Sequence, residues 1–496
     1  MVRGCTCCNE PPSIPGSIKI DDLPIELLID IFRCVTPTER SDIRLTHVCR
    51  IWRSTLQRTT EFWAKFLAVP DLITLGNYVR DVGFWHTWVD RTRTQPLQLR
   101  LRGRDLDLLK TIAEHLSRLA SLNAQWNMVY PRDVQRRLLA LGPLPALEEL
   151  RLTCDFPAPI SNFLDLEAAG LEGSTPRADE YPQLRHLGVN PDFFIPSMVV
   201  PSLKTLAIYH GHIKFEVLMS AFANCPTLES LRLDHAHFWD IRDTAPQVVF
   251  PHLRDLRLDY SDSTPTAVHA VFTHIQFPSI TRLTAFIGDC ALVGVIPDAH
   301  PLPILRILTR LAIQVYDATD DVPRTHTLSI KGYIDGEVRQ DTPQLYTVNQ
   351  RINWKHRGGW AFYTPLSGIT HSMGSPAVTK LELLLLDDQL NMTHIDWTRL
   401  FEAFPALVSL EVRIASCVGL LKALRRQPRR LSRLVRLGLT CGNASGVHHS
   451  LVLTLERRAS LGHGLQRLEF RNSNGPFSSW HLARLREVVS EVVLVV

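Results

Sequence analysis

The sequence lacks any hydrophobic run of the roughly 18 residues that a membrane-spanning helix requires. Its first residues contain no apolar stretch of signal-peptide length, so we expect an intracellular protein of the cytoplasm or nucleus. The 10 cysteines are scattered along 496 residues, as is typical of thiols in a reducing compartment. Neither charge is in large excess, because 54 Lys and Arg face 50 Asp and Glu. The resulting net charge of +4 predicts no nucleic-acid partner, and the lack of a long apolar run predicts no membrane partner.

Signatures of the common enzyme classes are missing as well. The chain has no glycine-rich phosphate-binding loop, no G-x-S-x-G nucleophile elbow and no H-E-x-x-H metal-binding helix. Histidines and carboxylates are numerous, but they are not paired at catalytic spacing. We therefore expect a protein that is not an enzyme and that has neither a cofactor nor a metal site.

What the chain does have is one short pattern that recurs along most of its length. It reads apolar, two variable residues, apolar, variable, apolar, and it usually follows a proline, as in PTLESLRL at residues 226–233. Twelve copies occur, and apart from the first gap and one of 70 residues their spacing scatters around a period in the high twenties. This spacing is the signature of leucine-rich repeats, in which each unit forms a short strand and stacked neighbours bury their apolar faces.

The pattern predicts an α/β fold, with an irregular leucine-rich-repeat solenoid of about twelve strand–helix units over residues 96–496. The ninth position of such a unit is often Asn, but here it is mostly small, as at Gly211 and Ala236, which favours irregular curvature. The alternative is an ordinary α/β domain in which the leucine spacing is coincidental.

Residues 316–375 interrupt the repeat and are rich in Tyr, Trp, Gly and charge. Alternating stretches within this insertion suggest a hairpin. Because a long irregular insertion in a repeat array is usually a surface loop, we expect it to be dispensable for folding. The alternative is that it is a binding element or hides a further repeat.

The N-terminal region has a different, helical pattern. Residues 1–18 read as a disordered segment and residues 67–95 as a helical linker, with a compact helical module between them. The first helix of this module should begin at Pro24, and Thr36-Pro37-Thr38-Glu39 reads as a capping box for the second. The first helix carries two apolar stripes, one of which includes Leu28 and Phe32 and the other Leu27 and Ile31. A module of this size can bury only one stripe in its own core, so the other stripe predicts a partner.

The order of motifs in residues 19–66 resembles an F-box. The motifs are Leu23-Pro24-x-Glu26, Ile31-Phe32, Val48-Cys49-x-x-Trp52 and a closing Trp63. An F-box followed by leucine-rich repeats resembles the substrate receptors of Skp–cullin–F-box ubiquitin ligases. That resemblance implies a three-helix bundle that docks a Skp-type adaptor and, through it, a cullin–RING complex. The residues that it implies face the adaptor are Leu23, Pro24, Leu28, Ile31, Phe32, Val48, Cys49 and Trp52. The alternative is a plain three-helix domain with these residues in its own core.

The repeats should present the outward side chains of their strands to an unknown protein target. The candidate target-binding residues are Arg232, Asp234, Arg257 and Asp259, and mutual pairing of solvated charges is the alternative explanation. The equivalent outward positions are acidic later in the array, so the strip should run from basic to acidic. Two further clusters stand out: His210, His212, His235 and His237 on adjacent repeats, read as lining a loop rather than binding metal, and a basic segment at 422–436, read as a solvated rim.

Overall fold

The computed structural model describes most of the chain, with gaps at both ends and in several connections. The described residues are 23–69, 78–102, 109–110, 112–126, 141–154, 178–242, 245–260, 265–287, 303–317, 325–334, 346–353, 377–385, 392–441, 446–472 and 477–495. The chain forms two compact units: Met1–Phe156 with Arg177–Arg185, and Pro157–Pro176 with His186–Val496. The predicted disordered segment, residues 1–18, lies outside the described residues.

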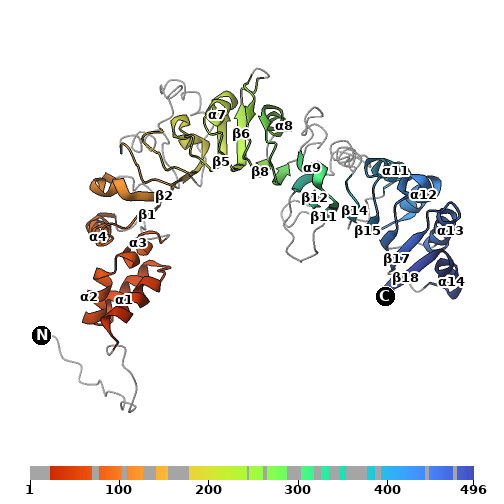
Figure 1. Ribbon diagram of the computed structural model, residues 1–496, viewed down its shortest axis with the longest axis horizontal. Helices are drawn as coiled ribbons and strands as arrows, with labels where there is room; N and C mark the ends of the chain where they lie inside the picture. The colour runs from red at the N-terminus through yellow and green to blue at the C-terminus, as the bar shows by residue number, and fades with distance from the viewer. Residues whose placement is uncertain are drawn as a thin grey trace, which may run out of the picture. The chain divides into compact units, whose positions relative to one another are not determined.

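The first unit begins with a small helical bundle (Figure 1). Its elements are α1 (Ile25–Cys34), the 3₁₀ helix η2 (Arg40–His47), α2 (Arg50–Arg58) and α3 (Thr60–Leu67). The first helix starts at Ile25, one residue after the predicted start. The capping box predicted for the second helix is wrong, because that helix begins at Arg40 with Glu39 and Asp42 as the reciprocal capping pair.

Aromatic side chains hold this bundle together and join it to the next helix. Trp63 is fully buried and donates its indole N–H to the Leu56 carbonyl at 2.7 Å. Helix α4 (Tyr78–Arg91) packs on α3, with the Trp88 ring 5.4 Å from that of Phe66 and the Arg91 guanidinium 4.6 Å above Trp63. The rest of the first unit contains the 3₁₀ helix η3 and parallel strands in the order β1-β2-β3. Their bounds are η3 (Ala113–Arg118), β1 (Leu97–Arg102), β2 (Leu119–Trp126) and β3 (Glu149–Cys154).

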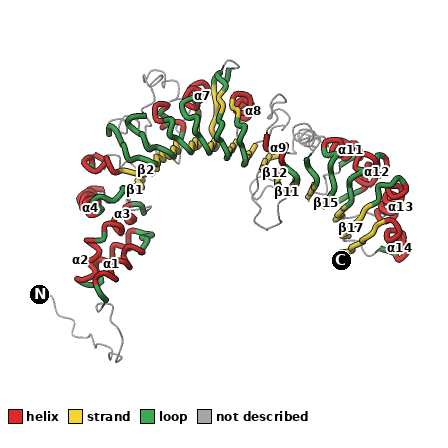
Figure 2. Tube along the Cα trace, in the orientation of Figure 1, coloured by secondary structure: helices red, strands yellow, loops and turns green. Residues whose placement is uncertain are grey.

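The second unit is built on a long sheet with helices on one side. Its described strands follow the spatial order β4, β5, β6, β8, β10, β13, β12, β11, β14, β15, β16, β17, β18. Their bounds are β4 (His186–Val189), β5 (Thr205–Lys214), β6 (Ser230–Trp239), β8 (Asp255–Tyr260), β10 (Arg282–Ile287), β13 (Tyr346–Asn353), β12 (Thr325–Tyr333), β11 (Arg310–Asp317), β14 (Lys380–Leu385), β15 (Ser409–Ile414), β16 (Arg436–Cys441), β17 (Leu465–Asn472) and β18 (Val489–Val495). Within this unit the strands lie on one side and the helices on the opposite side (Figure 2).

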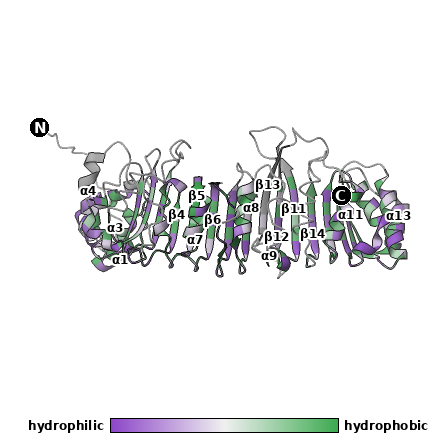
Figure 3. Ribbon diagram, turned by 90° about the horizontal axis from the view of Figure 1, so that it is seen from above, coloured by the Kyte–Doolittle hydropathy of each residue, from purple (hydrophilic) through white to green (hydrophobic). Residues whose placement is uncertain are grey.

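The recurring sequence pattern coincides with strands that pair in register. Each of its twelve copies leads into a strand, namely β3, β4, β5, β6, β8, β10, β11, β14, β15, β16, β17 and β18. Leu231 of β6 lies opposite Leu256 of β8, which in turn lies opposite Leu283 of β10, and all three are buried. Because side chains alternate along a strand, the intervening residues face outward. Green hydrophobic and purple hydrophilic segments accordingly alternate along these strands in Figure 3.

Residues 316–375 are not simply a surface loop, so that expectation is wrong for the part that the structure describes. β12 and β13 form an antiparallel hairpin, as the alternation suggested, but the hairpin lies within the sheet. β13 pairs parallel with β10, and β12 pairs antiparallel with β11. Leu328 and Ile330 of β12 are fully buried. The hairpin therefore lies between β10 and β11, two strands that both begin before the insertion, and β11 in turn pairs with β14 after it.

The connections between strands are less uniform than the predicted strand–helix units. α-Helices follow several strands, and they are α7 (Phe215–Phe222), α8 (Pro265–His274), α9 (Pro303–Ile307), α11 (His394–Ala403), α12 (Val418–Arg426), α13 (Val447–Ser460) and α14 (Ser479–Val488). Between β4 and β5 the connection contains only the short 3₁₀ turns η6 (Pro191–Phe193) and η7 (Pro196–Met198). A minor pair, β7 (Val248–Val249) with β9 (Ile275–Gln276), lies apart from the main sheet. Among the helices in the described part of the chain, none has the length and apolarity needed to cross a bilayer.

Candidate docking surfaces

Helix α1 divides its apolar residues between the bundle core and the surface. Leu28 and Phe32 are buried, and the Phe32 ring meets Trp52 of α2 edge-on at 5.1 Å. Leu27 and Ile31, four residues apart on the adjoining face, are 50% and 44% exposed. Residues four apart lie one above the other on a helix, so these two side chains form a continuous apolar stripe. This division matches the expected two-sided helix, except that Ile25, which helical spacing places on the stripe of Leu28 and Phe32, is exposed.

The turn into α2 adds further apolar side chains to the surface. Val48 is 56% exposed and Ile51, three residues on, is exposed as well. Between them, the Cys49 sulfur caps α2 by accepting the Trp52 backbone N–H at 3.4 Å. The cap fixes the start of α2, with Val48 just before the cap residue and Ile51 in the first turn of the helix. A surface with so many large apolar side chains on so small a bundle is typical of a binding site.

The predicted adaptor-facing residues therefore fall into three groups. Pro24, Ile31 and Val48 are exposed, whereas Leu23, Cys49 and Trp52 are half-buried. Leu28 and Phe32 lie in the core of the bundle, so their assignment to the adaptor-facing surface is corrected: they support the helix that presents Ile31. Ile51 is exposed but was not among the predicted residues, since nothing in its local pattern separates it from a core position.

Comparison with known proteins identifies this bundle. A family model described as F-box-like matches residues 20–68, and those residues are an F-box-like domain. Domains of this kind generally bind Skp-type adaptors in cullin–RING ligases, and the proteins that carry them are typically non-enzymatic adaptors. The match suggests such an adaptor role for this chain. A search of curated proteins found no match.

A second candidate surface lies on the outward side of β6 and β8. Asp234 is almost fully buried and pairs with Arg232 on its own strand, while its other carboxylate oxygen lies 3.5 Å from Arg257 Nε. Asp259 lies 3.9 Å from the Arg257 guanidinium. Register explains the cluster, because Arg232 lies opposite Arg257 and Asp234 lies opposite Asp259 on the neighbouring strand. The structure thus brings together all four predicted target-binding residues, and it also shows the mutual pairing weighed as the alternative.

The arginines of this face also stack on aromatic rings. The Arg232 guanidinium lies 5.4 Å from the Tyr209 ring centre, and Arg257 lies 5.5 Å from Phe286. Further along the sheet, the Arg310 guanidinium lies 5.1 Å from the Tyr333 ring centre and pairs with Glu382 of β14 at 2.7 Å. Stacking and pairing fix the direction of each guanidinium while leaving part of it exposed. We call Arg232, Asp234, Arg257, Asp259 and the stacked rings of Tyr209 and Phe286 the arginine strip.

The acidic half of the expected bipolar surface is partly neutralised. Glu382 pairs with Arg310, and Glu469 lies 3.6 Å from Arg471 and 3.9 Å from Arg467. Exposed ion pairs of this kind contribute little energy, but they reduce the local excess of charge. A simple gradient from basic to acidic therefore describes this face less well than a row of paired charges does.

The four histidines of β5 and β6 stack in pairs, as their repeat positions predict. The His210 and His235 rings lie 4.7 Å apart and the His212 and His237 rings 4.8 Å apart, both nearly parallel. Desolvation lowers the pKa of His210, with the charge of His235 acting in the same direction, and desolvation also lowers the pKa of His212. Among the described residues, the group of three donors close enough for one metal ion lies elsewhere, at His86, Asp90 and Glu114. The sequence places Asp262 one repeat further on, where its carboxylate could join these histidines, but Asp262 lies outside the described residues.

The basic segment at 422–436 forms regular structure. It spans the end of α12, the 3₁₀ helix η10 (Pro428–Leu431) and the start of β16. Its cations are exposed, and two of them contact neighbours, Arg430 with Glu402 and Arg426 with His394. The expectation of a solvated rim stays a prediction.

Proposed function

We propose that the chain is the substrate-recognition subunit of a cullin–RING ubiquitin ligase of the Skp–cullin–F-box type. In this proposal the F-box-like bundle docks a Skp-type adaptor. The strands and helices of the second unit form a leucine-rich-repeat solenoid that binds a protein target. Such a receptor performs no bond chemistry of its own. It acts by proximity, holding a target lysine within reach of a charged conjugating enzyme in the cytoplasm or nucleus.

The observation that carries the adaptor half of the proposal is the exposed apolar surface of the F-box-like bundle. Leu27, Ile31, Val48 and Ile51 present large hydrophobic side chains to solvent. Burying such side chains against a partner is favourable by about 25 cal/mol per Å² of apolar surface. Since Leu28 and Phe32 form the core beneath them, the surface is held in place without the partner.

The test of this half uses charge substitutions at exposed positions only. Ile31→Asp combined with Val48→Asp should abolish binding to a purified Skp-type adaptor, because each places a charge in an apolar contact. The matched control is Ile395→Asp on α11, where an isoleucine 52% exposed is replaced outside the bundle. Circular dichroism checks that every variant is folded. Unchanged adaptor affinity in a folded double variant would contradict the proposal.

The arginine strip supports the target-binding half. The guanidinium groups of Arg232 and Arg257 are half-exposed, and their ion pairs with Asp234 hold them in fixed orientations. They can therefore donate hydrogen bonds to a protein target without losing further side-chain entropy on binding. Replacing them by glutamate would confound the test, because new carboxylates would face the buried Asp234. Arg232→Lys with Arg257→Lys keeps the positive charges that pair with Asp234. It removes the planar guanidinium groups that stack on the rings of Tyr209 and Phe286.

This lysine double variant should capture less target from cell extract, with adaptor binding unchanged. A matched control is Arg425→Lys with Arg429→Lys, two exposed arginines of the basic segment. If the lysine variant of the arginine strip retains the full set of captured proteins, the target-binding surface lies elsewhere.

The second candidate is a repeat-based scaffold whose F-box acts outside a ligase. Reconstitution with adaptor, cullin and RING subunits separates the two. Transfer of ubiquitin to a captured protein supports the receptor, whereas capture without transfer supports the scaffold.

A further inference from the structure

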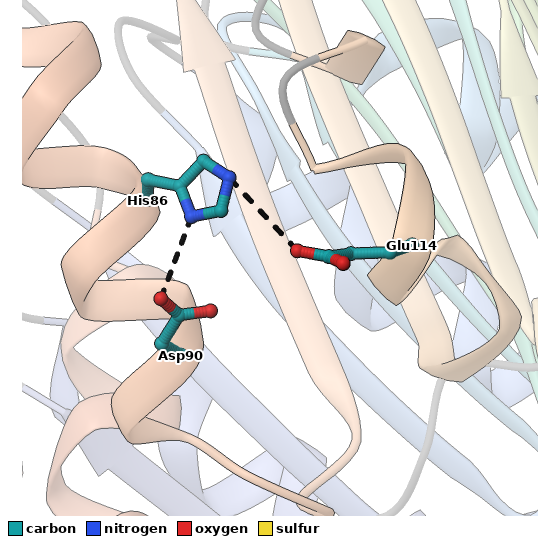
Figure 4. Close-up of side chains that lie close together, drawn as sticks. All are labelled: His86, Asp90 and Glu114. Atoms are coloured by element: carbon teal, nitrogen blue, oxygen red, sulfur yellow. Dashed lines mark hydrogen bonds and ion pairs between the residues drawn. The ribbon is translucent and has the colours of Figure 1, made fainter.

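Two imidazoles and two carboxylates gather where helix α4 and the 3₁₀ helix η3 meet in the first unit. Figure 4 shows three of them, His86, Asp90 and Glu114. His86 Nδ1 lies 3.4 Å from Asp90 Oδ2, and His86 Nε2 lies 3.9 Å from Glu114 Oε1. His115 Nε2 lies 3.0 Å from Asp90 Oδ1 and 3.5 Å from Glu114 Oε1. One donor atom from each of His86, Asp90 and Glu114 lies within 4.8 Å of the other two.

The backbone holds these donors in place. His86 and Asp90 are four residues apart on α4, so they point from the same face of the helix. η3 is fastened to the end of α4 by Arg118, which donates to the Val89 carbonyl at 3.0 Å, to the Gln95 carbonyl at 2.8 Å and to the Thr92 hydroxyl at 2.5 Å. The two elements that carry the donors are thus joined before any ligand binds.

Negative charge is concentrated in this cluster. Both nitrogens of His86 face carboxylate oxygens. A neutral imidazole can donate to only one of these carboxylates, whereas an imidazolium donates to both. The cluster holds two negative carboxylates, and a cation placed among the donors would be attracted to each of them.

We propose that His86, Asp90 and Glu114 bind a divalent transition-metal ion of the zinc class. Imidazole suits zinc, copper, iron and nickel, and zinc accepts carboxylate oxygen beside it. Two ligand atoms on a tetrahedral zinc ion lie about 3.3 Å apart, given metal–ligand bonds of about 2.0–2.2 Å. A single ion can bind only one of the two His86 nitrogens, and one donor atom from each of the three residues lies within 4.8 Å of the other two. Binding therefore requires the three side chains to close in by up to about 1.5 Å, which rotamer changes of exposed side chains can supply.

His115 is a positioning residue in this proposal. It is the least exposed of the four side chains, and its contacts with Asp90 and Glu114 orient both carboxylates. Residues that orient metal ligands typically change metal affinity by about 10–100-fold when replaced. The ion itself would cross-link α4 to η3, which stabilises the first unit by mass action as the metal concentration rises.

The test measures binding of zinc, and of cobalt as a spectroscopic probe, to the full-length chain by calorimetry and visible absorption. Because Cys5, Cys7 and Cys8 could also bind zinc, all variants carry Ser at these three positions. We expect about one equivalent of metal with a tetrahedral cobalt spectrum. His86→Ala or the isosteric pair Asp90→Asn with Glu114→Gln should remove that equivalent, and His115→Gln should weaken it by about 10–100-fold.

The matched control is His463→Ala, which removes a histidine outside the first unit. It should leave the equivalent in place. A chain that binds no zinc, or one whose binding survives His86→Ala and the Asp90→Asn/Glu114→Gln pair, overturns the proposal. The first result would mean that the cluster is not a metal site, and the second that the metal binds elsewhere in the chain.

Discussion

The two candidate docking surfaces differ in how their side chains are satisfied. On the F-box-like bundle, large apolar residues such as Ile31 and Val48 face solvent without a covering layer. On the arginine strip, the buried Asp234 pairs with two arginines that also stack on rings. The first surface gains energy by being covered, whereas the second offers direction and charge placement. The difference suits a constant partner at one surface and selective recognition at the other.

The largest expected effect concerns the hairpin of β12 and β13, which lies between β10 and β11 in the sheet of the second unit. Deleting residues 321–364 removes β12 and β13, so that β10 keeps only its pairing with β8 and β11 only its pairing with β14, each with one exposed edge. Thermal unfolding followed by circular dichroism should therefore lose the single cooperative transition of this unit. Deleting only residues 336–344, between the two strands, is the control. A wild-type transition after the larger deletion would restore the idea of a dispensable loop.

The next effect compares the buried and the exposed apolar residues of α1. Leu28→Asp places a charge in the bundle core and should cost more than about 3 kcal/mol, enough to unfold the bundle. Ile31→Asp, three residues later on the exposed face, should change stability by less than about 0.5 kcal/mol while removing adaptor binding. Chemical denaturation and an adaptor-binding assay distinguish the two. Equal stability of both variants would mean that α1 has no distinct core face.

The strands of the second unit could be predicted because their signal is local. Each copy of the repeat carries its own alternation of inward leucines and outward polar residues, as at Leu231, Arg232 and Leu233. The hairpin shows the limit of that reasoning. Alternation indicates that residues 325–353 form strands, but the pairing of β13 with β10 depends on contacts with residues far earlier in the chain.

The sites show the same limit. The two apolar stripes of α1 follow from helical spacing, but which residue of a stripe is buried depends on α2 and α3, so Ile25 and Leu28 were assigned alike. His86 and Glu114 are 114 − 86 = 28 residues apart and approach only because Arg118 fastens η3 to α4. The four-residue spacing of His86 and Asp90 on a helix was the one local signal, and two donors do not define a metal site.

A smaller effect tests whether pairing in the arginine strip stabilises the fold. Asp234→Asn removes the charge shared by Arg232 and Arg257 but keeps the shape of the side chain. Breaking a fully buried pair costs about 3–5 kcal/mol, but both arginines are partly exposed to solvent, so we expect about 1–2 kcal/mol. Urea denaturation measures it. A change within error would mean that solvent screens these pairs and that the strip contributes to recognition alone.

The smallest effect is the response of this face to acid. Desolvation lowers the pKa of His210 and of His212 in the folded chain, and for His210 the charges of His235 and Arg232 lower it further, while Asp234 and Asp259 oppose the shift.

Below the ordinary histidine pKa of about 6.5, the unfolded chain binds a proton at these positions that the folded chain does not. The contribution of these histidines to stability is therefore fully present above this pH and is lost as the pH falls through it toward the lowered folded pKa.

His210 lies in the left-handed region with φ of 37°, which Asn tolerates, so His210→Asn with His212→Gln is a compatible double variant. Its melting temperature should fall less steeply between pH 6.5 and 5 than that of the unmodified chain. His463→Gln, at a histidine of the same unit outside the stacked pairs, is the matched control. Equal slopes for the double variant and the unmodified chain would show that the stacked rings take up protons as readily as free histidine does.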